Sequence, residues 1–309
     1  MNRRQFIQRS LYLSSGALFL PSPFRLLARS YAEPIERVYV ALGTSIRFIV
    51  YHPEPPEARR AIHQAISCIQ EIQQRMSIQD RFSELNLWNR SKTGSHIPLH
   101  PLTQEAITQA WNMRRLTQDR FDPTIASFSR SHIPLEERQL IWKEERLFKP
   151  HPSIRLDLGG SAKGWAVDKA MEILIASGCQ TALINAGGDL RVFNAPPDLQ
   201  AWTIGITDPR APDKLLARFH LRNQAIATSG DYTGAISQLR DPRDGTLIVL
   251  NGSVSVVAPT CGEADAWATA LAIEPELSLL PATYAGIIAR YQNNKFIYKT
   301  SPNLQGAIL

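Results

Sequence analysis

The 309-residue sequence has little cysteine: Cys68, Cys179 and Cys261 are its three, far apart and without a C-x-x-C pair. An odd number of widely spaced cysteines predicts neither a disulfide framework nor a zinc site. The chain also has no Gly/Ser linker, charge block or short-period repeat that would mark a domain boundary. Length alone allows one large domain or two. We expect one compact unit over residues 33–309, long enough to bury a full hydrophobic core.

Acidic residues are absent from residues 1–32, which contain five arginines. The apolar run in this segment is short. The pair Arg3-Arg4 precedes the moderately apolar stretch 11–20, and Ser30-Tyr31-Ala32 offers a small-x-small cleavage site. This order predicts a twin-arginine export signal over 1–32 and a periplasmic protein, held at the inner membrane if the signal stays uncleaved. The alternative is an ordinary basic N-terminus with a short buried helix. With no cysteine near the cleavage site, we expect no lipid anchor and at most peripheral membrane association.

Beyond residue 32 the chain has 29 basic and 28 acidic residues, so the high isoelectric point comes mostly from the N-terminal segment. Nucleic-acid binding needs a basic face on the folded domain. The composition gives no support for such a face, and we expect no nucleic-acid partner.

Helical and strand patterns alternate irregularly along the chain. Helices are predicted at 55–76, 102–118, 162–176 and 262–272 from their apolar spacing, with a short turn or helix at 83–86. Strands are predicted from runs of apolar residues bounded by turns, at 37–42, 45–51, 154–158, 182–185, 189–193, 202–207, 217–222, 224–228, 253–258, 284–290 and 295–300. Sequential strands with hairpin-like turns favour an α+β fold over a βαβ alternation.

The segment Cys261–Leu271 contains a carboxylate and a hydroxyl four residues apart in a helical pattern, Asp265 and Thr269. At this spacing the two side chains lie on the same helix face. Two hard oxygen ligands on one face form half of a magnesium site. The alternative is a helix with an N-terminal carboxylate and a packed threonine, and with nothing bound.

A second motif, residues 156–168, combines a predicted strand end, the pair Gly159-Gly160 and a helix start. Backbone N–H groups at such a junction favour anions, and Lys163 supplies a positive charge there. The spacing fits neither a Walker loop nor a dinucleotide-binding fingerprint. The alternative is a tight turn with a solvated lysine.

Further short motifs occur in an informative order along the chain together with the two described above. The full series is Gly43-Thr44; Met76-Ser77, Ser83-Glu84-Leu85 and Asn89; Phe121-Asp122-Pro123-Thr124; residues 157–164 and 166–168; Asn185 and Gly187-Gly188-Asp189; Gly205-Ile206 and Asp208-Pro209; residues 227–232; Asp241-Pro242-Arg243 and Gly245; residues 256–259, 263–265 and 268–270. In this order, the motifs resemble those of the ApbE family of FAD:protein FMN transferases.

The resemblance implies a T-fold-like architecture in which antiparallel sheets pack with helices. It also implies a Mg²⁺-dependent enzyme that splits FAD, attaches FMN to a Thr or Ser hydroxyl of an acceptor flavoprotein of an electron-transfer system, and releases AMP. The metal ligands implied are Asp265, Thr269 and the carbonyl of Gly160. Residues implied to contact FAD are Leu42, Gln79, Asp122, Pro123, Thr124, Asp157 and Lys163.

Three departures from the family pattern concern the acceptor and flavin side. Gln238 replaces the family histidine that is a candidate base, and Arg240 replaces an apolar residue. Gln79 replaces an aromatic residue near the flavin. The stretch between Thr124 and Asp157 is short and lacks the usual glycine-proline and tryptophan-glycine elements, for which Trp142 is a partial substitute.

The departures leave three functions open. The first is a flavin transferase in which Asp241, or metal activation alone, replaces the histidine base, because neutral Gln238 accepts no proton near pH 7. The second is a Mg²⁺-dependent FAD pyrophosphatase, in which water replaces the acceptor hydroxyl. The third is a periplasmic FAD-binding protein without catalysis.

Overall fold

An antiparallel sheet of eight strands, in the order β1-β2-β6-β7-β10-β11-β12-β13, organises the fold. The computed structural model describes residues 33–129, 133–143, 146–208, 211–230, 239–292 and 295–304, so the expected export signal lies outside it. The strands of this sheet are β1 (Ile35–Ala41), β2 (Thr44–Tyr51), β6 (Thr181–Ala186), β7 (Asp189–Phe193), β10 (Ala225–Gly230), β11 (Gly252–Ala258), β12 (Ala285–Gln292) and β13 (Lys295–Thr300).

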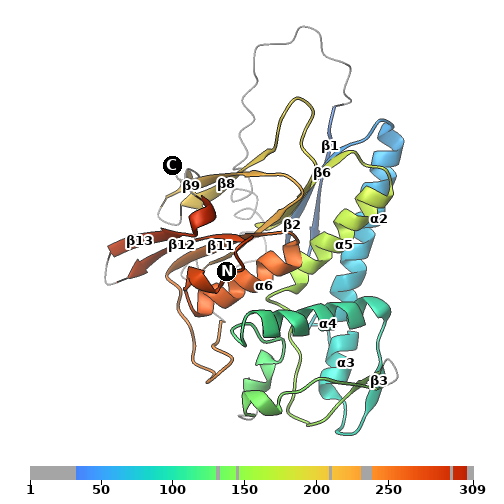
Figure 1. Cartoon of the computed structure of the whole chain (residues 1–309). Coiled ribbons are helices and arrows are strands. Elements are labelled where there is room, and N and C mark those ends of the chain that lie inside the picture. Colours follow the sequence, from blue (N-terminus) through green and yellow to red (C-terminus); the bar gives the residue numbers. More distant parts are fainter. Residues whose placement is uncertain are drawn as a thin grey trace, which may run out of the picture.

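Helices cover one face of the sheet (Figure 1). The helix α5 (Ala162–Ala176) packs between α2 (Pro55–Met76) and α6 (Cys261–Ile273). Below them in Figure 1 lies α4 (Pro101–Leu116), which contacts α2 and α6. The larger of two hydrophobic clusters fills the space between these helices and the sheet. The remaining helical segments are α3 (Glu84–Arg90), η1 (Ile125–Ser129), η2 (Leu135–Glu137), η3 (Leu277–Leu279) and η4 (Pro302–Leu304).

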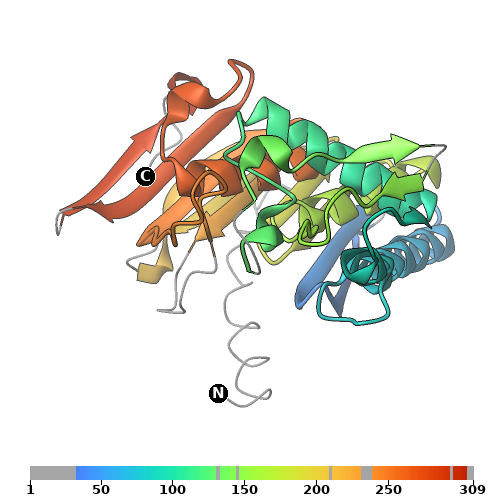
Figure 2. The same cartoon turned by 90° about the horizontal axis from the view of Figure 1, so that it is seen from below.

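The opposite face of the sheet is covered by a hairpin of β8 (Trp202–Asp208) and β9 (Ala211–Leu221), visible with the sheet in Figures 1 and 2. A second hydrophobic cluster lies there. In β6, Ala182 and Ile184 belong to the helix-side cluster, whereas Leu183 belongs to the hairpin-side cluster. Because successive side chains point to opposite faces, a strand covered on both sides needs apolar residues at every position.

Helix termini follow from local chemistry. Pro55 begins α2, where a missing N–H costs nothing. The hydroxyl of Thr260 caps α6 by accepting a hydrogen bond from the amide of Glu263. Most residues of α5 and α6 are buried, because each helix lies between the sheet and its neighbours. Among the described residues, no helix is both long enough and apolar enough to cross a membrane.

The structure confirms the predicted α+β class with antiparallel strands, and α5 and β7 have the predicted bounds. The strand predicted at 154–158 is wrong. The backbone N–H and C=O of Leu156 bond to the side chain of Asn89, at 2.7 and 2.8 Å, and the amide of Arg155 bonds to Ser127 Oγ at 3.0 Å. Side chains satisfy this segment, so it joins no ladder.

A three-stranded sheet of β3 (His96–Pro98), β5 (Arg146–Phe148) and β4 (Ile141–Lys143) was not predicted. Each strand has three residues, which is too short for an alternating pattern to emerge from the sequence. The strand predicted at 217–222 also begins earlier than expected, because β9 starts at Ala211 and pairs irregularly with β8 around Thr207.

Candidate active site

Helices α5 and α6 meet in close contact at Gly164. A Cβ atom at this position would lie 2.2 Å from the carbonyl oxygen of Cys261 and 2.9 Å from Cβ of Asp265. Only glycine allows such an approach. The amide of Gly164 donates a hydrogen bond of 3.1 Å to Oδ2 of Asp265. The start of α5 therefore lies directly beside the carboxylate that the sequence indicates as a metal ligand.

Lys163 lies between two buried carboxylates. Its ammonium group forms an ion pair with Asp189 at the start of β7, and it lies 3.9 Å from Oδ2 of Asp265. The side chain of Lys163 remains 37% exposed, whereas those of Asp189 and Asp265 are 2% and 5% exposed. The side chain of Lys163 is therefore more accessible to a ligand than either carboxylate.

The charges of this cluster depend on one another. Burial disfavours the ammonium form of Lys163, but Asp189 and Asp265 outweigh burial and raise its pKa above the ordinary value. Burial and then the charge of Asp189 raise the pKa of Asp265 to about 7, against the opposing effect of Lys163. A buried carboxylate with a raised pKa gains from a nearby cation.

Asp189 has a place at the site that the sequence analysis did not assign. The sequence indicated it only as the flank of the pair Gly187-Gly188. That pair forms the turn between β6 and β7, closed by a 2.9 Å hydrogen bond from the amide of Gly188 to Asn185 Oδ1. The turn places the first residue of β7 beside the first turn of α5, and the Asn-x-Gly-Gly-Asp pattern was the signal for it.

The three implied metal ligands lie together. Thr269 Oγ1 lies 3.3 Å from the carbonyl oxygen of Gly160, and Asp265 is one helical turn before Thr269. A Cβ atom at Gly160 would meet Thr269 at 3.1 Å and Phe121 at 3.2 Å, so a larger residue would displace this carbonyl. A carboxylate, a hydroxyl and a carbonyl are the hard oxygen donors that Mg²⁺ prefers, and this donor set fits the ion.

No cluster of three or more His, Cys, Asp or Glu side chains suited to a metal occurs within the described ranges. The implied Mg²⁺ site has only one such side chain, Asp265. A metal site of this kind therefore depends on a backbone carbonyl and a hydroxyl beside that carboxylate, and substrate phosphate oxygens can complete the coordination of the ion.

Asp157 lies beside the loop 121–124, as expected of two segments implied to contact one ligand. The backbone amide of Asp157 donates a 2.7 Å hydrogen bond to the carbonyl of Pro123. Its carboxylate accepts a 2.8 Å hydrogen bond from the amide of Gly159, and burial raises its pKa. The Asp122 carboxylate accepts hydrogen bonds from the hydroxyl and the amide of Thr124, at 2.6 and 2.8 Å.

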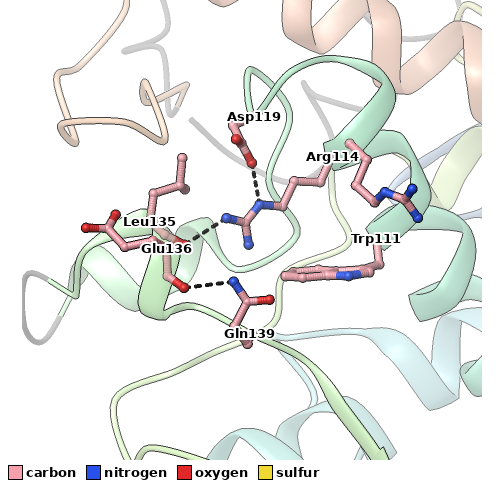
Figure 3. Close-up of a pocket in the computed structure, with 7 residues that line it drawn as sticks. Trp111, Arg114, Asp119, Leu135, Glu136 and Gln139 are labelled. Atoms are coloured by element: carbon pink, nitrogen blue, oxygen red, sulfur yellow. Dashed lines mark hydrogen bonds and ion pairs between the residues drawn. The ribbon is translucent and has the colours of Figure 1, made fainter.

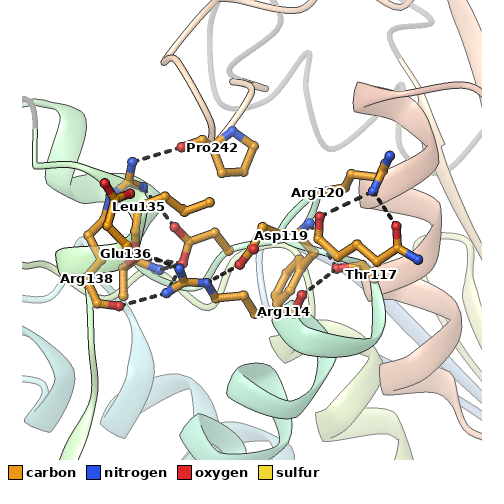
Figure 4. A network of polar contacts seen from close by, with 12 residues as sticks. Arg114, Thr117, Asp119, Arg120, Leu135, Glu136, Arg138 and Pro242 are labelled. Carbon is orange, nitrogen blue, oxygen red and sulfur yellow. Dashed lines mark hydrogen bonds and ion pairs between the residues drawn. The ribbon is translucent and has the colours of Figure 1, made fainter.

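The Asp122 carboxylate is also paired with an arginine that the sequence analysis missed. Arg138 donates 2.8 Å hydrogen bonds to Asp122 Oδ2 and to the carbonyl of Pro242, the latter visible in Figure 4. The side chains of Asp122 and Arg138 are 0% and 1% exposed. This pair fixes the loop 121–124 to the turn 241–243. Arg138 lies in the short, motif-free stretch before Asp157, where no pattern indicated it.

Asp241 is held by the guanidinium of Arg243, with contacts of 2.9 Å to Oδ1 and 2.7 Å to Oδ2. Arg243 also bonds Glu274 at the end of α6, at 2.7 Å. The hydrogen bond from Arg243 lowers the pKa of Asp241, which makes this carboxylate a weak base. Gln238, the other predicted acceptor-side residue, lies outside the described residues.

Leu42 and Gln79 lie at two turns near the C-terminal end of α2. Leu42 has φ of 54° in the turn between β1 and β2, and its amide donates to the side chain of Gln73. Gln79 is exposed, and its amide lies 3.3 Å from Ser77 Oγ. Among the described residues, no hydrogen bond or ion pair joins either residue to the Lys163 cluster.

A pocket of about 370 Å³ opens elsewhere, at the end of α4 (Figure 3). It is lined by Trp111, Arg114, Arg115, Asp119, Leu135, Glu136 and Gln139. Arg114 spans its wall, with hydrogen bonds of 2.7 Å to Asp119 and 2.8 Å to the carbonyl of Leu135. None of the predicted site residues lines this pocket, so it is separate from the Lys163 cluster.

Two relatives align with this protein over most of its sequence and most of their own. A protein of Chlamydia trachomatis named FAD:protein FMN transferase is 26% identical over 82% of this chain and 89% of its own length. A protein of Vibrio cholerae with the same name is 24% identical over 81% of this chain and 85% of its own length.

Solved structures show the same fold. The flavin transferase ApbE from Vibrio cholerae superposes with a TM-score of 0.76 at 22% identity, over 89% of this chain and 99% of that protein. The flavinyl transferase ApbE of Pseudomonas stutzeri, in its apo form, gives 0.79 at 20% identity, over 91% and 99%. The model of the ApbE family matches residues 42–281. This match confirms the resemblance that the motifs indicate: the chain belongs to the ApbE family.

Proposed function

We propose that this protein is a FAD:protein FMN transferase, which moves FMN from FAD to a Thr or Ser hydroxyl of an acceptor flavoprotein and releases AMP. The observation that carries the proposal is the cluster of Lys163, Asp265, Thr269 and the Gly160 carbonyl at the crossing of α5 and α6. Membership of the ApbE family and the names of the relatives support the same activity.

Asp265, Thr269 and the carbonyl of Gly160 would hold Mg²⁺. When bound, this ion neutralises charge on the pyrophosphate of FAD as a Lewis acid. The site offers the ion one buried carboxylate, whose raised pKa of about 7 reflects burial among like charges. The neighbouring Lys163 is fixed by Asp189, so its charge is in place before substrate arrives.

The reaction exchanges one bond to phosphorus for another. The acceptor hydroxyl oxygen bonds to the phosphorus of the FMN half, and the bond to the bridging oxygen breaks. AMP leaves with that oxygen, and the hydroxyl proton passes to solvent or to a base. The ammonium of Lys163 stabilises the phosphate charge, and the Asp157 segment positions the dinucleotide. Catalysis of phosphoryl transfer depends mainly on such positioning and charge stabilisation.

The proposed location is the periplasm, reached by twin-arginine export. The support is the sequence pattern of residues 1–32, with its arginine pair, its apolar stretch and its small-residue cleavage site. Twin-arginine export carries proteins that are already folded. The three cysteines are free and their spacing predicts no disulfide framework, which agrees with folding before export. The acceptor is then a periplasmic or membrane-bound flavoprotein of electron transfer.

The test incubates the purified chain with FAD, Mg²⁺ and an acceptor that carries a Thr-containing target motif. We expect in-gel flavin fluorescence on the acceptor together with AMP release. An acceptor whose target Thr is replaced by Val should show no flavin fluorescence. AMP without a labelled acceptor would identify a FAD pyrophosphatase instead. Bound FAD without AMP would identify a binding protein and exclude both enzymes.

A further inference from the structure

One carboxylate of α5 caps the neighbouring helix α6. Asp168 accepts hydrogen bonds of 2.8 Å from the amides of Cys261 and Gly262, the first two residues of α6. These amides have no partner within their own helix. The side chain of Thr260 serves a different amide, that of Glu263. The N-terminus of α6 is therefore fastened to α5 as well as capped by its own residue.

The second contact between the two helices lies one turn earlier on α5. Gly164 bonds Asp265 Oδ2 and leaves no room for a Cβ atom against Cys261. Asp168 and Gly164 are four residues apart, so both lie on the face of α5 that meets α6. Two attachment points on one helix fix both the position and the rotation of the other.

Arg191 of β7 also binds Asp168, and we call the contacts of Asp168 and Gly164 with α6 the α5–α6 joint. Its guanidinium donates a 2.8 Å hydrogen bond to Asp168 Oδ1, the same oxygen that accepts from Cys261. The strand β7 also begins with Asp189, the partner of Lys163. Asp168 is 6% exposed, so its carboxylate binds groups of the protein interior and is not freely accessible to a ligand.

We propose that Asp168 is a positioning residue: it sets the rotation of α6 on α5, so that Asp265 and Thr269 face the Gly160 carbonyl and Lys163. The inference rests on the proposed function, because it takes this donor set as the Mg²⁺ site. A small rotation of α6 would separate Thr269 from the Gly160 carbonyl, which lies 3.3 Å away. Outer partners that orient metal ligands typically change metal affinity about 10- to 100-fold when they are removed.

The test compares two variants at the same helix terminus. Asp168→Asn keeps the size of the side chain but replaces one accepting oxygen with a donor, which opposes one of the two α6 amides. Thr260→Ala removes the ordinary cap of α6 and leaves the α5–α6 joint intact. Mg²⁺ alone is titrated into each purified full chain by calorimetry, and thermal melting reports fold stability. Arg191→Gln gives a milder version of the first change, because the carboxylate stays in place.

We expect Mg²⁺ affinity to fall about 10- to 100-fold in Asp168→Asn, to fall less in Arg191→Gln and to stay unchanged in Thr260→Ala. Wild-type affinity in folded Asp168→Asn or, where that variant does not fold, in Arg191→Gln would overturn the inference. Equal losses in Asp168→Asn and Thr260→Ala would also overturn it, because helix stability alone would then explain them. A wild-type chain that binds no Mg²⁺ would remove the metal site itself, which is a failure of the proposed function.

Discussion

The ammonium nitrogen of Lys163 lies 3.9 Å from Oδ2 of Asp265, across the crossing of α5 and α6. This distance joins two motifs that are a hundred residues apart in the sequence. One supplies a positive charge, and the other supplies a carboxylate and a hydroxyl of the kind that a divalent ion prefers. A pyrophosphate bound at this crossing would contact cations on two sides, and this is the arrangement that phosphoryl transfer requires.

Replacement of Asp265 tests the metal assignment. We expect Asp265→Ala to abolish Mg²⁺-dependent turnover, with a loss of at least about 100-fold, the scale of one pre-organised electrostatic contact. Lys163 keeps Asp189 as its partner in this variant, so the fold should persist. The measurement is AMP release at varied Mg²⁺ concentration, with circular dichroism to verify folding.

Glu263→Gln is the matched control, because Glu263 lies on the same helix and pairs with the hydroxyl of Thr260 instead of the cluster. We expect this control to retain turnover. Unchanged activity in Asp265→Ala would remove the metal assignment, whatever the control does.

Much of the fold was readable from the sequence where an apolar pattern is bounded by residues typical of turns. The helix at 162–176 and the strand at 189–193 were predicted with their observed bounds. The segment 154–158 has a strand-like apolar pattern, yet Asn89 satisfies its backbone instead of a neighbouring strand. A hydrogen bond from a distant side chain leaves no periodic trace in the sequence, so pattern analysis assigns such a segment to a ladder.

The site was readable where it follows motifs and unreadable where it depends on tertiary pairing. The spacing of Asp265 and Thr269 predicted one helix face, and the structure places both on α6. Asp189 and Arg138 were not assigned to the site, because their partners are 26 and 16 residues away. Such separations match neither a helix nor a strand period, and only the folded chain brings these charges together.

Gln238 tests the acceptor side, in a segment outside the described residues. We expect Gln238→His to raise the rate of FMN transfer, because an imidazole accepts a proton near its ordinary pKa of about 6.5 and a neutral amide does not. The gain should appear as pH rises through about 6.5, where the imidazole becomes neutral. Initial rates of acceptor labelling between pH 5.5 and pH 8, an interval chosen around about 6.5, provide the measurement. Gln238→Asn is the control; a histidine variant that matches it would mean that no base acts from this position.

Lys149 makes stability depend on pH. Its ammonium is fully buried, bonded to the carbonyl of Ile154 and 3.9 Å from the centroid of a Trp88 ring, and burial lowers its pKa to about 7. Above that pH the unfolded chain holds a proton that the folded chain has lost. The free energy of unfolding should therefore rise between about pH 7 and pH 10, by up to about 1.4 kcal/mol per pH unit from this group.

Urea unfolding at several pH values measures this slope. We expect Lys149→Met to flatten it, since the variant has no ammonium to bury. Lys143→Met, at an exposed position in β4 of the three-stranded sheet whose strand β5 ends just before Lys149, should keep it. A slope that survives in Lys149→Met would assign the pH dependence to another group.

Arg138 and Arg243 allow a buried ion pair to be compared with an exposed one. Arg138→Met leaves the carboxylate of Asp122 in the interior with the more distant guanidinium of Arg114, 4.0 Å from Oδ1, in place of the Arg138 pair, whose side chains are at most 1% exposed. Removing one partner of such a pair costs about 3–5 kcal/mol. The side chain of Arg243 is 42% exposed, and solvent screens its pairing with Asp241, so Arg243→Met should cost about 1 kcal/mol or less. Urea midpoints at neutral pH give both values. Equal losses in the two variants would show that the Arg138 pair is solvated, and that it does not fasten the loop 121–124 to the turn at Pro242.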